Sequence, residues 1–111
     1  MNNQVHPKAE GVKHDSGKPR MELLPPEALE DIAKVFSFGA NKYGDYNWRG
    51  GIKTTRLVGA ILRHIFSYLS GETNDPESGL PHIAHAGCGV MMVLSMMKRR
   101  PDLDDRYTEQ K

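Results

Sequence analysis

The segment from Pro81 to Lys98 is apolar or small at almost every position. A helix with apolar residues on all its faces must be covered on every side, at the centre of a bundle or in an interface between subunits. The proline at its start, the basic residues 98–100 at its end and Pro101 beyond it are typical helix boundaries. This segment therefore predicts a fold built around one buried helix.

Two earlier segments also have helical periodicity. Apolar residues from Glu27 to Tyr43 follow the spacing of a helix with one buried stripe, preceded by two prolines and followed by Gly44. Residues 54–70 carry a wide apolar face. No segment has the alternating pattern of a strand, so we predict an all-α fold, a small helical bundle.

The second of these helices raises a question about its polar face. Arg56 and Arg63 stand seven positions apart there, with small side chains near them. This face is either plain solvent-exposed surface or the wall of a pocket, because small residues leave room and arginine binds anions. The sequence leaves both interpretations open.

The length of 111 residues predicts one domain over 1–111. Residues 1–24 are polar, and their apolar residues have neither helical nor strand periodicity. We predict an extended arm or substrate loop there. Residues 101–111 form a charged tail, expected to fray after a short helical turn. A core of this size is modest, so we expect a homo-oligomer, a dimer or a tetramer.

Composition narrows the function classes. Fifteen basic and fourteen acidic residues give a net charge of +1, which provides no basis for binding a nucleic acid polymer or an anionic membrane. The single cysteine, Cys88, excludes a disulfide framework and a thiolate metal site. The first residues lack an apolar signal segment, and we expect a cytoplasmic protein.

Metal-binding side chain types gather between the second and third helices. Glu72 and Asp75 lie in the loop, His82 and His85 lie three residues apart at the start of the third helix, and His64 precedes the loop. Neutral imidazole and carboxylate can share a hard cation, so we predict a Mg²⁺ or Mn²⁺ site. Taken singly, these residues would be structural histidines and solvated turn carboxylates. We predict Glu72, Asp75, His82 and His85 as metal ligands and Glu72, Asp75 and His85 as catalytic.

Two further groups of side chains suit a nucleotide phosphate. The arm carries K-H-D-S-G-K-P-R, and the loop 41-NKYGDYNWRGG-51 combines cations with aromatic rings that stack on a base. The alternatives are a mobile exposed arm, and aromatic rings that plug the core at the helix end. The predicted substrate-binding residues are Lys13, Asp15, Lys18, Arg20, Lys42, Tyr43, Asn47, Trp48, Arg63 and His64.

Three sequence blocks resemble a known family. They are 11-GVKHDSGKPRMELLPPEAL-29, 38-FGANKYGDYNWRGG-51 and 63-RHIFSYLSGETNDPESGLPHIAHA-86. These are similar to the phage dATP/dGTP pyrophosphohydrolases of the MazZ type, relatives of the all-α MazG nucleotide pyrophosphohydrolases. The resemblance implies hydrolysis of a purine deoxynucleoside triphosphate to the monophosphate and pyrophosphate. It also implies Mg²⁺ or Mn²⁺, an oligomer, and action of a phage protein in the bacterial host cytoplasm.

The chain departs from the wider MazG pattern of metal ligands. It has no E-E-x-x-E, and its third helix carries His82-x-x-His85 where E-x-x-D would be sought. Glu72 and Asp75 supply an E-x-x-D just before that helix. The predicted ligands therefore rest on the local chemistry and are not copied from MazG.

The mechanism predicted is attack by an activated water on the triphosphate, because no nucleophilic serine or cysteine arrangement is evident. One alternative is an HD-type nucleotide phosphohydrolase, although the one His-Asp pair, His14-Asp15, lies in the arm instead of a helix. The other is a catalytically silent helical module that binds nucleotides.

Overall fold

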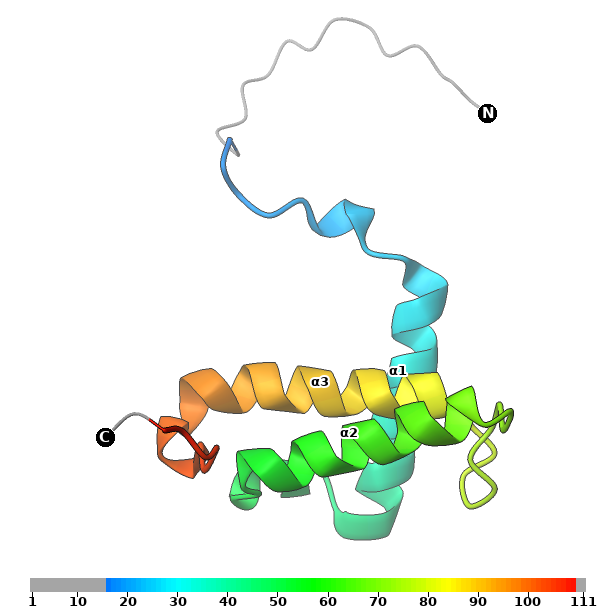
Figure 1. Cartoon of the computed structure of the whole chain (residues 1–111). Coiled ribbons are helices and arrows are strands. Elements are labelled where there is room, and N and C mark those ends of the chain that lie inside the picture. Colours follow the sequence, from blue (N-terminus) through cyan, green and yellow to red (C-terminus); the bar gives the residue numbers. More distant parts are fainter. Residues whose placement is uncertain (1–15, 110–111) are drawn as a thin grey trace, which may run out of the picture.

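The computed structural model describes residues 16–109, and their regular structure is helical (Figure 1). The α-helices are α1 (Pro26–Tyr43), α2 (Thr54–Leu69) and α3 (His82–Arg99), with short 3₁₀ turns at Met21–Leu23, Asn47–Gly50 and Pro101–Leu103. Within this described part there is no strand, and an isolated bridge joins Asn74 to Pro81. The all-α fold class is therefore confirmed.

The helices α1 and α3 begin and end next to the proline and glycine residues that the sequence places there. Pro26 occupies the first turn of α1, where its missing N–H costs no hydrogen bond. Gly44 ends α1 at a φ of 101°, a value that side chains with a Cβ rarely adopt. Pro81 precedes α3 and Pro101 follows it. The predicted boundaries of all three helices are met within two residues.

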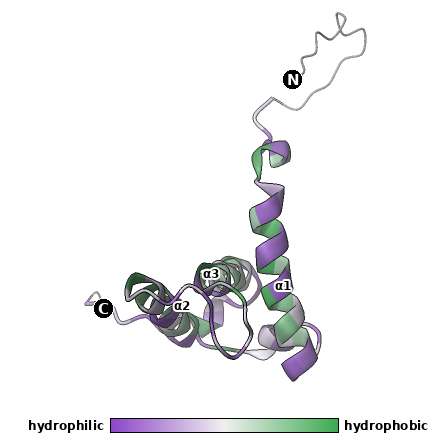
Figure 2. Ribbon diagram, turned by 90° about the vertical axis from the view of Figure 1, so that its right-hand side faces the viewer, coloured by the Kyte–Doolittle hydropathy of each residue, from purple (hydrophilic) through white to green (hydrophobic). Residues whose placement is uncertain are grey.

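The helices α2 and α3 form an antiparallel pair, and α1 crosses them at a steep angle (Figure 1). Figure 2 shows that the N-terminal half of α1 projects beyond this pair together with residues 16–25. The C-terminal half of α1 packs against α3. This arrangement brings the end of α1, the middle of α2 and the start of α3 to one place.

Two glycines of α3 allow this close packing. A Cβ added at Gly87 would lie 2.8 Å from Cδ1 of Ile32 on α1. One added at Gly89 would lie 2.6 Å from Cγ1 of Ile61 on α2. Both distances are shorter than real Cβ contacts, so the absence of a side chain at each position sets how near α3 comes to its neighbours.

The core is small and lies mainly along α3. Val35, Ala84 and Cys88 form its centre, with Ile32 and Met92 among the side chains packed around it. Within one chain the apolar helix α3 is not covered on all sides. The exposed apolar residues of its uncovered face are Ile83, Val90, Met91, Leu94 and Met97.

The residues after α3 return to the start of α2. Asp105 accepts hydrogen bonds from the backbone N–H of Thr55 at 2.9 Å and from its hydroxyl at 2.7 Å. These bonds satisfy a free donor in the first turn of α2. The expected short helical turn is present at Pro101–Leu103, but the segment after it is docked by Asp105 instead of frayed.

Among residues 16–109, none of the helices has the length and apolar character that crossing a membrane requires.

Candidate functional site

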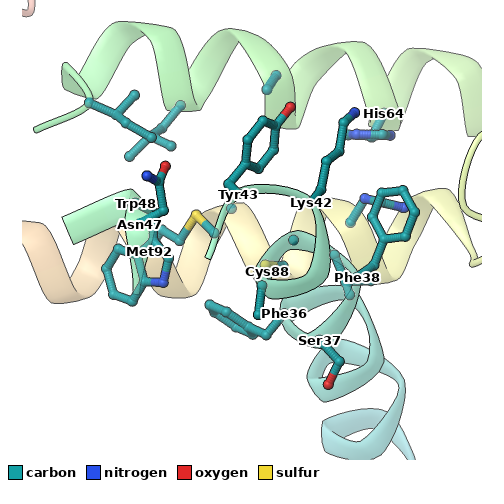
Figure 3. Close-up of a pocket in the computed structure, with 18 of the residues that line it drawn as sticks. Phe36, Ser37, Phe38, Lys42, Tyr43, Asn47, Trp48, His64, Cys88 and Met92 are labelled. Carbon is teal, nitrogen blue, oxygen red and sulfur yellow. The ribbon is translucent and has the colours of Figure 1, made fainter. Parts of the chain in front are cut away.

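A pocket of about 880 Å³ lies where the three helices meet (Figure 3). This volume is within the usual range for small-molecule sites. Its walls come from the end of α1, the following loop, the middle of α2, the loop before α3 and the first half of α3. It gathers many of the predicted site residues: Lys42, Tyr43, Asn47, Trp48, Arg63, His64, Asp75 and His85.

One end of the pocket is aromatic and apolar. Figure 3 shows Trp48, Asn47 and Met92 at this end. The ring of Trp48 lies 6.1 Å from that of Phe36 at an angle of 57°, a tilted aromatic pair. Trp48 is thus half-buried and anchored to α1, while the ring of Tyr43 is 62% exposed. Tyr43 is therefore not the core plug that the sequence allowed.

The polar face of α2 forms a wall of the pocket. Arg56, Ala60, Arg63 and His64 all line it. These residues line the pocket, as one of the two interpretations predicted, and Arg56 and Arg63 are at the same time exposed to solvent.

The loop between α2 and α3 is folded around Asp75. Its Oδ1 accepts the backbone N–H groups of Glu77 at 2.7 Å and Ser78 at 3.3 Å. The backbone N–H of Asp75 donates to the carbonyl of Leu80 at 2.8 Å. Oδ1 is occupied by these bonds, and Oδ2 lies 3.8 Å from Nδ1 of His64. Asp75 thus fixes the loop with one oxygen and presents the other to α2.

His64, Asp75 and His82 form a cluster of candidate metal ligands. One donor atom from each lies within 4.8 Å of the other two. The Nδ1 atoms of His64 and His82 face each other at 2.9 Å. The side chain of His82 is almost fully buried, so this arrangement is held by packing between α2 and α3.

Glu72 holds the other side of His82. Its Oε1 lies 2.7 Å from Nε2 of His82. A carboxylate accepts at this distance, so Nε2 donates and carries a hydrogen. In the neutral ring, Nδ1 then carries a lone pair directed at His64. Histidines that bind metals are commonly held by a carboxylate in this manner.

Burial keeps two of the histidines neutral. Desolvation lowers the pKa of His64, and the neighbouring His85 lowers it further. Desolvation likewise lowers the pKa of His85. The rings of the two residues stack with centroids 4.5 Å apart and planes 12° apart. Partial burial by itself would raise the pKa of Asp75, but hydrogen bonds from the backbone of Glu77 and Ser78 hold it below its usual value.

An ion pair closes one side of the pocket. Lys42 at the end of α1 is paired with Glu77 in the loop before α3. Its Nζ also lies 5.2 Å from the ring centre of Tyr43 and 5.8 Å from that of Phe38. The hydrogen bond to Glu77, the largest contribution, raises the pKa of Lys42. The ammonium group of Lys42 is therefore held at the pocket rim by Glu77, an exposed carboxylate that an anion of higher charge can replace.

Some predicted residues lie elsewhere. Lys18 and Arg20 are exposed on the segment before α1, and Arg20 pairs with Glu22 at 2.9 Å. Neither lines the pocket. Lys13 and Asp15, also predicted to bind substrate, fall outside residues 16–109.

Sequence reasoning did not put forward Ser78 or Cys88 as site residues. Ser78 contacts His85, and no pattern in the loop indicated this contact. Cys88 lines the pocket, but burial raises the pKa of its thiol to about 11. A thiol with that pKa is almost entirely protonated at neutral pH and is a poor nucleophile.

Residues 8–106 match the family described as "dATP/dGTP diphosphohydrolase, N-terminal". A curated protein of Salmonella phage PMBT28 named dATP/dGTP diphosphohydrolase is 40% identical over 96 residues, which cover 86% of this chain and 33% of that protein. The chain thus spans about a third of the relative that it matches. No solved structure matches it.

The matched region contains all three helices and every residue that lines the pocket. The chain therefore belongs to the dATP/dGTP diphosphohydrolase N-terminal family.

Proposed function

We propose that this chain hydrolyses purine deoxynucleoside triphosphates, dATP or dGTP, to the monophosphate and pyrophosphate with a divalent cation. One observation carries the proposal: a single pocket has an aromatic end and a polar end, where His64, Asp75 and His85 lie among cations, while the buried His82 adjoins His64 from outside the pocket lining. The family and the name of the phage relative, dATP/dGTP diphosphohydrolase, support the substrate class. The cytoplasm, expected from the sequence, is where such a substrate is available.

The aromatic end suits the base. Trp48 packs against Phe36 and has the guanidinium of Arg49 5.3 Å from its ring centre, and we assign its pocket side to stacking on the base, which an aromatic ring does for any base. The amide of Asn47 can both donate and accept, which matches the edge of a purine. We assign Tyr43, exposed between the two ends of the pocket in Figure 3, to the sugar.

The cationic end suits the triphosphate. Lys42, Arg56 and Arg63 line the pocket and can neutralise phosphate charge. A triphosphate carries more charge than the carboxylate of Glu77, so we expect Lys42 to exchange that partner for phosphate oxygens. Lys18 and Arg20 stay candidates for the phosphates on their chemistry alone.

His64, Asp75 and His82 are the residues proposed to hold the cation. Without an ion, the 2.9 Å between the two Nδ1 atoms is a hydrogen-bond distance, and a bound cation would take the place of that hydrogen between the two imidazoles, with Asp75 as the third ligand. Two imidazoles and one carboxylate favour Mn²⁺ over Mg²⁺. Glu72 then orients His82 instead of binding the ion, while His85 faces the nucleotide. When bound, such a cation polarises phosphoryl oxygens and lowers the pKa of water.

Direct attack by water is favoured over a covalent intermediate. The Cys88 thiol is protonated, and Ser78 does not line the pocket. Asp75 is ionised at neutral pH, since its pKa is held below the usual value. It can hold the cation and accept a hydrogen bond from water, so binding and activation lie within one cluster.

Product analysis tests the proposed reaction. With dGTP and Mn²⁺, we expect dGMP and pyrophosphate in equal amounts, and no turnover in EDTA. Orthophosphate released from dGMP would instead support an HD-type phosphohydrolase. Binding of dGTP without any product would support a silent nucleotide-binding module, and either result would contradict the proposal.

We also propose that the chain forms a homo-oligomer through α2 and α3. In addition to the uncovered face of α3, the helix α2 exposes Val58, Leu62, Phe66 and Leu69 at helical spacing. Two adjacent apolar stripes on an antiparallel helix pair can meet the same stripes of a second copy and form a four-helix bundle. A second copy of the chain carries the same apolar stripes, so it can cover them without a different partner protein.

Replacing Leu94 with glutamate should separate the oligomer into monomers. Leu94 is 55% exposed in one chain and would be covered in the bundle, where an unpaired charge costs several kcal/mol. Sedimentation equilibrium should give a multiple of 12.4 kDa for the original chain and a single chain mass for the variant. Tyr107→Glu, at an exposed position of the tail, is the matched control. A monomeric original chain would refute the interface.

A further inference from the structure

Among residues 16–109, the imidazole of His85 has one hydrogen-bond partner, and that partner is not part of the pocket lining. Nε2 of His85 is 2.6 Å from Oγ of Ser78. The ring stacks on His64 and meets the edge of the Phe38 ring at 84°. His85 lines the pocket and Ser78 does not. One ring nitrogen is therefore engaged by a residue outside the pocket lining, and the other ring nitrogen has no hydrogen-bond partner among residues 16–109.

The hydrogen bonds of the Ser78 hydroxyl indicate which nitrogen of the His85 ring carries the hydrogen. Oγ accepts the backbone N–H of Leu80 at 3.1 Å. A hydroxyl has a single hydrogen to donate, and Nε2 of His85 is the one acceptor in reach among residues 16–109. If Nε2 were the donor, the hydroxyl hydrogen would have no acceptor in this half-buried position, which is costly. Ser78 thus donates to Nε2, and the neutral ring carries its hydrogen on Nδ1.

The serine is held in this orientation by the loop. Oδ1 of Asp75 accepts the backbone N–H of Ser78, and the N–H of Gly79 donates to the carbonyl of Asp75 at 2.7 Å. At the end of the loop, the N–H of His82 donates to the carbonyl of Thr73 at 2.9 Å. The loop that offers Asp75 to the cation cluster therefore also sets the hydroxyl that contacts His85.

We propose that Ser78 is a positioning residue that fixes His85 as the Nδ1–H tautomer, so that His85 donates a hydrogen bond to a phosphoryl oxygen of the bound nucleotide. This inference rests on the proposed function for the identity of the acceptor. The role differs from that of a general base, because the lone pair of the ring is occupied by Ser78. A neutral imidazole that donates to a reacting oxygen stabilises negative charge there.

Nitrogen NMR of the full chain tests the tautomer without any turnover. With ¹⁵N-histidine at a pH of about 8, well above the usual histidine pKa, protonated and bare ring nitrogens give separate signals. His85→Gln identifies the His85 signals. We expect Nδ1 protonated and Nε2 bare in the original chain and in Ser78→Thr, and a mixture of tautomers in Ser78→Ala. A protonated Nε2 in the original chain, or an unchanged ratio in Ser78→Ala, would overturn the proposal.

Steady-state kinetics of Ser78 variants distinguish a positioning role of Ser78 from a general loss of folding. Ser78→Ala should lower kcat for dGTP about tenfold with little change in KM, and Ser78→Thr should restore most of it. Ser70→Ala, an exposed serine bonded to the carbonyl of Ser67, is the matched control and should leave kcat unchanged. Equal kcat for Ser78→Ala and the original chain would contradict the positioning role.

The two proposals fail in different ways. If the NMR shows the Nδ1–H tautomer but the chain hydrolyses no dNTP, the proposed function is wrong and the tautomer assignment stands. If dGTP is hydrolysed while Nε2 carries the hydrogen, the function stands and the role of Ser78 is wrong.

Discussion

Replacing Asp75 with asparagine should abolish cation binding and lower kcat for dGTP by about a thousandfold or more, while the loop keeps its fold. The amide oxygen of asparagine can still accept the N–H groups of Glu77 and Ser78, as Oδ1 does now. Its NH₂ group replaces Oδ2, which faces His64, and an NH₂ group cannot bind a cation. The variant therefore removes one ligand without removing the turn.

Two measurements check this expectation. Calorimetric titration with Mn²⁺ should show binding to the original chain and none to Asp75→Asn, and circular dichroism should show the same helix content. Glu77→Gln is the matched control, because Glu77 is in the same loop but pairs with Lys42 at the rim. It should retain Mn²⁺ binding. An Asp75→Asn variant with the original affinity for Mn²⁺ would exclude Asp75 as a ligand.

Replacing Trp48 with alanine should raise KM for dATP and dGTP by roughly 5- to 150-fold, the equivalent of about 1–3 kcal/mol of base stacking. The effect should fall mainly on KM, since Trp48 lies at the opposite end of the pocket from His64 (Figure 3). Trp48→Phe keeps a ring against Phe36 and should lose much less.

Trp48 is also the one tryptophan of the chain, so its fluorescence reports directly on the pocket. We expect a non-hydrolysable dGTP analogue to change this fluorescence in a saturable manner. Pyrophosphate alone should bind without the same change, because it has no base. An unchanged KM in Trp48→Ala, or equal responses to the analogue and pyrophosphate, would remove Trp48 from the base site.

The helices could be predicted closely because local residues define them. Proline before α1 and α3, Gly44 after α1 and the spacing of apolar residues are all properties of short segments. The face of α2 that carries Arg56 could be recognised but not assigned, since its exposure depends on where α1 crosses. That crossing is set by the contact of Gly87 with Ile32, which no local pattern reveals.

Many residues of the site could be predicted from the sequence, but the contacts between them could not. Asp75 and His82 were predicted as metal ligands, and one donor atom of each lies within 4.8 Å of the other and of one of His64, while cation binding there stays a prediction. His64 was predicted to contact substrate; it lines the pocket, and its Nδ1 also faces His82, a contact that depends on the close packing of α2 and α3 near Gly89. The contact between Ser78 and His85 depends on the folding of an irregular loop, for which hydrophobic periodicity carries no information.

Pulsed electron paramagnetic resonance of Mn²⁺ added to the full chain tests the central claim most directly. If His64 and His82 hold the ion together with Asp75, the spectrum should contain couplings to two imidazole nitrogens, and one should vanish in His64→Ala. A spectrum of hydrated Mn²⁺ without nitrogen coupling, both alone and with a dGTP analogue present, would contradict the account.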